Sequence, residues 1–140
     1  MTYPLPRTGD VVPARSENDA LILNLNDLPL LLRNDGGNAQ NWIKLKLIGT
    51  KCKRTAIGAR VRVVTGTHAQ TDEVHSGASV MSQSDLRLYF GLGRSQAADL
   101  VEVIWPTTQK IERFTGLKAN QILTIREGSG IVDSFKPKTK

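Results

Sequence analysis

The 140-residue sequence has little cysteine, few aromatic side chains and no long apolar run. Because Cys52 is the only cysteine, an internal disulfide and a metal site built from several cysteines are both excluded. No apolar run approaches the roughly 20 residues of a membrane-spanning helix, so we expect no membrane span. Residues 1–10 lack a basic segment followed by an apolar one, so no signal peptide is predicted in this chain.

Acidic residues are missing between Lys44 and Val64, where lysine and arginine recur. The net charge of +6 comes mainly from this stretch and from the lysines near the C-terminus. Basic tails are usually only solvated, and an even spread of charge is not the footprint of a nucleic-acid-binding protein. We therefore predict no nucleic-acid partner.

Two segments of the basic stretch alternate between apolar and basic residues, which is the period of half-buried β-strands. We expect Ile43, Leu45 and Leu47 to face the core, as Val61 and Val63 do. If the two segments pair, one exposed sheet face carries Trp42, Lys44, Lys46, Arg60 and Arg62. Such a face is either a binding surface, on which the tryptophan stacks on a sugar ring, or a solvated one. The tryptophan could instead cover an N-terminal hairpin.

Short predicted strands follow one another about every ten residues, with turns between them, which favours a sandwich or barrel. We therefore predict an all-β fold, an antiparallel β-sandwich or barrel-like domain, with an N-terminal hairpin packed on it. The predicted parts are an irregular arm (1–18), the hairpin (19–37), the β domain (38–128) and a flexible tail (129–140).

Three local predictions concern the second half of the domain. Gly91-Leu92-Gly93 is expected to end a strand as a turn, because glycine tolerates conformations that break regular structure. A single helical turn is predicted from Ser95 to Asp99, with Ser95 as its cap. The segment Leu100 to Trp105 is apolar on both faces, which favours a central strand, with Trp105 in the core.

Polar side chains that could do chemistry are few. A small hydrolase would need a pocket that holds His75 and Ser82, yet no serine lies in a Gly-x-Ser-x-Gly motif. His68, Asp72 and His75 could hold a metal only if one strand presented them together, and exposed positions are the simpler interpretation. We predict no catalytic residue, no metal site, no cofactor and no enzymatic activity.

Two other polar features have structural interpretations. Asp85 precedes a strand and is expected to cap a turn, and it is the expected counter-ion of Arg54. Cys52 lies among Lys51, Lys53 and Arg54, cations that favour the thiolate and would lower its pKa, but an idle thiol is a simpler interpretation than a reactive one.

Several motifs, taken together and in order, resemble the ASPIC/UnbV domain family. They are Asn41-Trp42-Ile43, Gly49-Thr50, Arg54, Ala56 to Val61, Ser82 to Asp85, Phe90 to Gly93, Val101 to Pro106 and Ala119-Asn120-Gln121. The agreement covers roughly Asn41 to Glu127, and it implies structural roles for Arg54, Gly58, Asp85, Gly91 and Gly93. The family usually has Ser-Asn where this chain has Cys52-Lys53.

The resemblance also implies a context. Such domains usually end FG-GAP or VCBS-type repeat proteins, whose β-propellers are secreted, so an extracellular or cell-envelope location is expected. Ala20 to Asn26 and Leu30 to Gly36 resemble the last strands of such a propeller. The Asp-rich calcium loop that normally precedes those strands is missing, so no calcium is expected.

These observations support three functional hypotheses. In the first, the chain is a non-catalytic interaction module that binds a glycan or an acidic partner surface through the basic sheet face. In the second, it is a structural cap, or a self-association domain that forms homo-oligomers through the N-terminal hairpin. The third is the small hydrolase described above.

Overall fold

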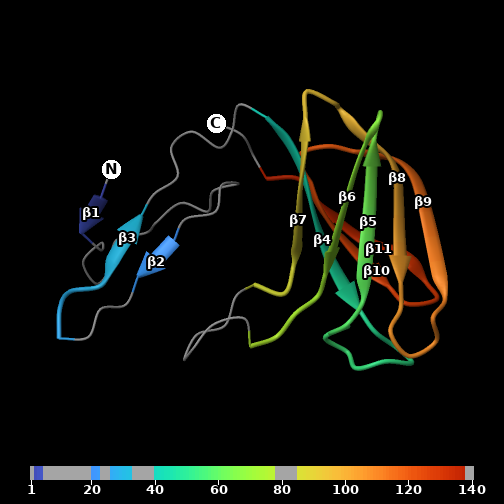
Figure 1. Cartoon of the computed structure of the whole chain (residues 1–140), viewed down its shortest axis with the longest axis horizontal. Coiled ribbons are helices and arrows are strands. Elements are labelled where there is room, and N and C mark those ends of the chain that lie inside the picture. The colour runs from blue at the N-terminus through green and yellow to red at the C-terminus, as the bar shows by residue number, and fades with distance from the viewer. Residues whose placement is uncertain (1, 5–19, 23–25, 33–39, 78–84, 138–140) are drawn as a thin grey trace. The chain divides into compact units, whose positions relative to one another are not determined.

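A computed structural model of the chain describes residues 2–4, 20–22, 26–32, 40–77 and 85–137. The chain divides into two compact units, residues 40–136 and residues 1–39 with 137–140. All regular structure in the described residues is β-strand, as predicted (Figure 1). In that part of the chain no helix is long and apolar enough to cross a membrane.

The smaller unit contains a three-stranded antiparallel sheet. Its strands are β1 (Thr2–Pro4), β2 (Ala20–Ile22) and β3 (Leu30–Leu32), in the order β1-β3-β2. The predicted N-terminal hairpin corresponds to β2 and β3, which pair through Leu21 and Leu31. The arm, predicted to be irregular, contributes β1, which pairs with β3 on its other side. Strand β3 therefore has neighbours on both sides within its own unit.

The larger unit begins with a sheet in the strand order β11-β10-β4-β7. The β4–β10 pair is parallel, in contrast to the other pairs of this sheet, and its register sets Leu45 beside Leu123. The strands are β4 (Asn41–Ile48), β7 (Leu88–Gly93), β10 (Gln121–Arg126) and β11 (Gly130–Phe135).

The second sheet of this unit is entirely antiparallel, in the order β6-β5-β8-β9. Its central strand β8 contains most of the segment Leu100 to Trp105, as the double-sided apolar pattern predicted. The strands are β5 (Arg60–Thr65), β6 (His68–Glu73), β8 (Ala97–Ile104) and β9 (Ile111–Lys118).

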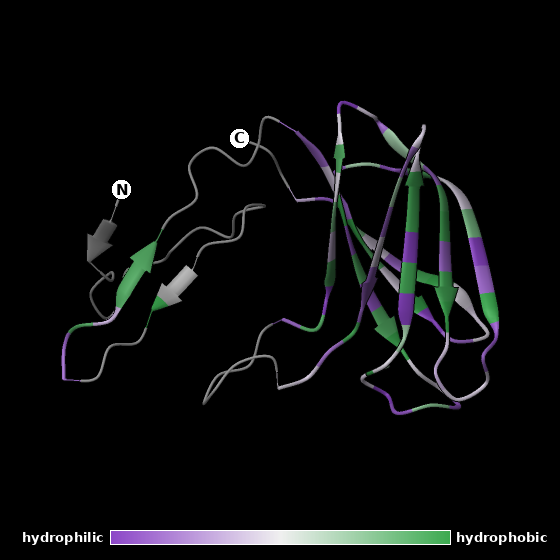
Figure 2. Cartoon of the chain, in the orientation of Figure 1, coloured by the Kyte–Doolittle hydropathy of each residue, from purple (hydrophilic) through white to green (hydrophobic). Residues whose placement is uncertain are grey.

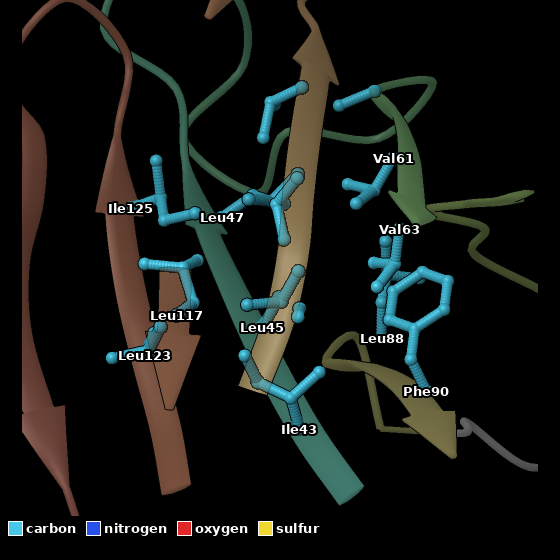
Figure 3. Packing of buried hydrophobic residues seen from close by; sticks show 14 of the residues in the cluster. Ile43, Leu45, Leu47, Val61, Val63, Leu88, Phe90, Leu117, Leu123 and Ile125 are labelled. Atoms are coloured by element: carbon cyan, nitrogen blue, oxygen red, sulfur yellow. The ribbon is translucent and has the colours of Figure 1, made fainter. Parts of the chain in front are cut away.

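The inner faces of the two sheets form one apolar core. Ile43, Leu45 and Leu47 of β4 lie in one cluster with buried residues of β5, β7, β9 and β10, as Figure 3 shows. Hydrophobic and hydrophilic bands alternate along β5 in Figure 2, as expected for a strand with one buried face. Trp105 is fully buried, which confirms its predicted place in the core. The predicted β-sandwich is therefore correct, with one parallel strand pair inside it.

Two of the local predictions about the second half of the domain are wrong. Strand β7 does not stop at Phe90 but continues to Gly93, because Leu92 is buried and extends the inward-facing series. A register shift opposite Asn41 accommodates the extra residue. The segment predicted as a helical turn instead starts β8, in which Ala98 is fully buried opposite Leu117.

The predicted flexible tail contains a strand. Residues Gly130–Phe135 form β11 at the edge of the first sheet, paired with β10. Ile131, Val132 and Phe135 remain exposed there, so this strand lacks the buried face that produces an alternating sequence pattern. The sequence signal that reveals inner strands is consequently weak at this edge.

Candidate functional site

The predicted basic sheet face does not exist as a single surface. Strands β4 and β5 do not pair, because each belongs to a different sheet of the sandwich. Their apolar side chains meet in the core, so their basic side chains lie on the two opposite outer faces. Lys44 and Lys46 are on one of these faces, and Arg60 and Arg62 are on the other.

The arginines of β5 are engaged in ion pairs on the sheet surface. The Arg60 Nε lies 3.3 Å from Glu73 Oε2, and the Arg62 guanidinium donates to Glu102 at 3.2 Å. Arg113 on the neighbouring strand donates to the same Glu102 carboxylate at 2.7 Å. Hydrogen bonds from Arg113 and Arg62 lower the pKa of Glu102. The arginines of this face are paired with carboxylates, so they are not available in the way that the sequence suggested.

Lys44 is buried on the opposite face, between two aromatic rings. Its Nζ lies 5.0 Å from the centre of the Trp42 ring and 4.6 Å from that of Tyr89. Only 7% of Lys44 is exposed, and the Trp42 side chain is half-buried. Cation–π contacts of this kind stabilise a lysine away from water. Trp42 and Lys44 thus stack on each other, which differs from the predicted role of an open sugar platform.

Lys46, the second basic residue of this face, borders a groove of about 550 Å³ at the end of β4. Basic side chains and an apolar floor share this groove, which we call the cationic groove. Its lining consists of Lys46, Leu47, Ile48, Arg54, Thr55, Asp85, Leu86, Arg87 and Ile122. Lys46 and Arg54 form no ion pair with another described residue, so their charges are available to a ligand.

Asp85 organises one wall of the groove. Its Oδ1 accepts the backbone N–H of Arg87 at 3.0 Å, which is the turn cap that its position predicts. Its Oδ2 accepts hydrogen bonds from Arg87 Nε at 2.5 Å and from the Tyr89 hydroxyl at 2.8 Å. Burial raises the pKa of Asp85, but the hydrogen bonds from Arg87 and Tyr89 outweigh burial and lower it. Asp85 is therefore the counter-ion of Arg87. The prediction that it pairs with Arg54 is wrong.

The opposite wall belongs to the loop of residues 49–58, which a buried carboxylate holds in place. Glu127 Oε2 accepts three consecutive backbone N–H groups, those of Thr50, Lys51 and Cys52, at 2.9, 2.8 and 3.2 Å. Its other oxygen accepts the Thr108 hydroxyl at 3.1 Å. Successive N–H groups that converge in this way form an anion-binding concavity, and here the chain fills it with its own carboxylate.

The environment of Glu127 sets its ionisation and that of the neighbouring thiol. Burial acts to raise the pKa of Glu127, but the backbone hydrogen bonds from Thr50, Lys51 and Cys52 lower it to about 2. Burial also raises the pKa of Cys52, and the negative charge of Glu127 adds to this effect. The prediction that nearby cations lower the thiol pKa is therefore wrong, because burial and the Glu127 carboxylate both act in the opposite direction.

The glycines with predicted structural roles differ in what requires them. Gly58 has a φ of +87°, and Gly93 has a φ of +59°, so both occupy a region that other residues rarely adopt. A Cβ on Gly91 would meet no atom within 4 Å, and nothing in the structure explains a glycine there. Gly49, by contrast, has no room for a side chain: a Cβ would lie 2.3 Å from the Lys53 carbonyl oxygen.

Residues considered for catalysis lie elsewhere. His68 and His75 are exposed, and His75 Nδ1 is 4.0 Å from Glu73 Oε1 at the surface. Neither histidine lines the cationic groove, and Ser82 lies outside the described residues. No three His, Cys, Asp or Glu side chains gather as a metal site in the described ranges.

The comparison with known proteins identifies the fold family. A family model described as ASPIC and UnbV matches residues 49–132, more than half of the chain. The chain belongs to the ASPIC and UnbV family. No curated protein matches the chain closely enough to count as a relative. The ASPIC and UnbV match contains the whole loop of residues 49–58 and its anchor Glu127, whereas Trp42, Lys44 and Lys46 precede it.

Glu127 is the residue that sequence reasoning missed. A single glutamate after the last predicted strand carries no motif of its own. The available signal was indirect: Lys51, Lys53 and Arg54 lie in a loop without acids, whose backbone and side chains both attract a negative charge. Asp85 was predicted to supply that negative charge, but it forms an ion pair with Arg87.

Proposed function

We propose that this chain is a non-catalytic interaction module that binds an acidic segment of a partner protein in the cationic groove. The observation that supports this function is the convergence of Lys46 and Arg54, without acidic partners among the described residues, beside an apolar floor. The lysine comes from β4 and the arginine from the loop that Glu127 anchors, so both sit on well-fixed backbone.

The lining suits an amphipathic partner. Leu86 and Ile122 are half-buried and present apolar surface between the basic groups. An acidic side chain that pairs with Lys46 or Arg54 would bring its neighbours onto this apolar surface, and burial of apolar area supplies affinity that exposed ion pairs lack. A glycan bound across a wide basic sheet face is less well supported, because the four cations occupy opposite faces of the sandwich. As for location, the family resemblance supports a module at the cell envelope or outside the cell.

The experiment compares two double variants that remove the same charge. Lys46→Gln with Arg54→Gln changes the groove, whereas Arg60→Gln with Arg62→Gln changes the opposite face. A fluorescent poly-glutamate peptide serves as the probe, and its anisotropy reports binding at low salt. We expect the groove variant to weaken binding by about tenfold, which corresponds to 1.4 kcal/mol from two exposed ion pairs.

The matched variant should retain binding within about twofold, because Arg60 and Arg62 are already paired with Glu73 and Glu102. Equal weakening by both variants would show that the peptide responds only to net charge. Absence of binding to the unmodified chain would also contradict the proposal. The affinity should fall as salt increases, since exposed charges are screened over about 10 Å at 0.1 M.

A further inference from the structure

A second pocket lies at the other end of β4 from the cationic groove. It has a volume of about 610 Å³, within the range of about 300–1,000 Å³ that small-molecule sites occupy. Carboxamide and ammonium groups dominate its lining, which also includes a strand glycine. The residues that matter here are Asn41, Gln96, Gly116, Lys118, Asn120 and Lys136, and we call the site the amide pocket.

The two asparagines are held in place by each other and by the backbone. Asn120 Nδ2 donates to Asn41 Oδ1 at 2.8 Å, and Asn41 Nδ2 donates to the Ser95 carbonyl at 3.0 Å. Asn120 Oδ1 accepts the backbone N–H of Trp42 at 3.2 Å. A carboxamide has two donor hydrogens and two acceptor lone pairs. Asn41 and Asn120 each donate one and accept one of these hydrogen bonds, so each amide keeps one donor and one acceptor position for a ligand. The remaining positions are already oriented, which reduces the entropy lost when a ligand binds.

The charge of the amide pocket is positive. Lys118 and Lys136 are exposed, and none of the residues in the lining is acidic. Gly116 has a φ of +63°, and a Cβ there would meet no atom within 4 Å, so the strand leaves open space beside Lys118. The two ammonium groups can bind a carboxylate. The oriented amides beside them can bind groups that both donate and accept hydrogen bonds.

We propose that the amide pocket binds a carboxylated sugar, such as a uronic acid. Sugar hydroxyls donate and accept hydrogen bonds, which matches the amides, and the carboxylate matches the two lysines. Inorganic phosphate presents mainly acceptor oxygens, so it would use the lysines but only the donor half of the amides. The motifs that contain Asn41 and Asn120 lie at opposite ends of the domain sequence, and this pocket is where they meet.

The test uses the full chain, labelled with ¹⁵N, and D-glucuronate as the probe. We expect saturable shifts of the backbone signals of Gly116, Ala119 and Lys136, with a Kd on the order of 1 mM. Glucose lacks the carboxylate and phosphate lacks the hydroxyl pattern, so each should bind at least about tenfold more weakly, a difference of 1.4 kcal/mol or more.

Three variants separate the contributions. Lys118→Gln with Lys136→Gln should abolish the shifts, whereas Lys51→Gln with Lys53→Gln removes the same charge elsewhere and should leave them. Gln96→Ala keeps both lysines and removes a donor and an acceptor, so it should weaken glucuronate binding more than any phosphate binding, which uses only the donor. The proposal is overturned if glucuronate shifts none of these signals, if phosphate binds as tightly, or if the Lys51 and Lys53 variant loses binding too. The cationic-groove variant with Lys46→Gln and Arg54→Gln should still bind glucuronate, so the two proposals fail separately.

Discussion

Replacing Glu127 with glutamine removes the charge of a carboxylate that joins three parts of the sandwich. Glu127 directly follows β10. Its carboxylate accepts hydrogen bonds from backbone amides of the loop of residues 49–58 and from the hydroxyl of Thr108. The side chain is only 4% exposed, so water does not replace the lost interactions. Glutamine has the same length as glutamate, and the Glu127→Gln variant therefore changes the charge with little change in packing.

Two routes give the size of the effect. Hydrogen bonds to charged groups contribute about 1.5–3 kcal/mol each, but glutamine keeps one oxygen that still accepts part of the set. Burial acts to raise the pKa, but the same hydrogen bonds lower it from 4.5 to about 2 on folding, which corresponds to at most about 3 kcal/mol at neutral pH. We therefore expect a loss of about 2–3 kcal/mol. For a domain of this size that loss lowers the Tm by about 10–20 °C.

Thermal unfolding followed by circular dichroism at neutral pH measures the effect. Glu73→Gln is the matched control, because it removes a carboxylate from a surface ion pair with Arg60 and should cost less than about 1 kcal/mol. Thr108→Val removes a single hydroxyl donor and should fall between the two variants, near 1 kcal/mol. A Tm loss for Glu127→Gln no larger than that of Glu73→Gln would refute the structural role of this carboxylate.

Further predictions concern pH and the glycines. Because the pKa of Glu127 is lowered on folding, its contribution is fully present above about pH 4.5 and is lost as the pH falls toward 2. The Tm difference between the unmodified chain and Glu127→Gln should therefore shrink over that window, and a constant difference would contradict a pKa of about 2 for Glu127. Gly49→Ala should destabilise the domain by about 2 kcal/mol or more, because its Cβ would collide with the Lys53 carbonyl. Gly91→Ala, by comparison, should change the stability by less than about 0.5 kcal/mol, and equal effects at the two glycines would show that the close contact is not decisive.

The strands with a buried face could be predicted from the sequence. Ile43, Leu45, Val61 and Val63 reveal the inner faces directly, because side chains alternate between the two faces of a strand. The edge strand β11 could not be predicted, since its residues are exposed and their pattern does not depend on a core.

The pairing of the strands could not be predicted from the sequence. Alternation shows that β4 and β5 each have one buried face, but it does not show whether they share a sheet or lie in opposite sheets. The predicted basic face required β4 and β5 to lie in one sheet. Which strands share a sheet depends on contacts between residues far apart in the sequence. Lys44 shows the same limit: a lysine on an outer face is expected to be solvated, yet two aromatic rings bury it.

The cationic groove was therefore predictable only in part. Lys46, Arg54 and Asp85 were singled out, but for different reasons and as parts of different features. The structure brings them to one groove because the loop of residues 49–58 folds back around Glu127, a contact between residues about 75 positions apart. No local pattern predicts a contact at that separation.

The most direct test of the proposed function is chemical-shift mapping of the ¹⁵N-labelled chain with poly-glutamate peptide at low salt. The account predicts that the shifted backbone signals cluster at residues 46–48, 54–55 and 85–87, which line the cationic groove. Shifts centred on Arg60, Arg62 and the neighbouring residues of β6 would place the acidic ligand on the opposite sheet and contradict the account.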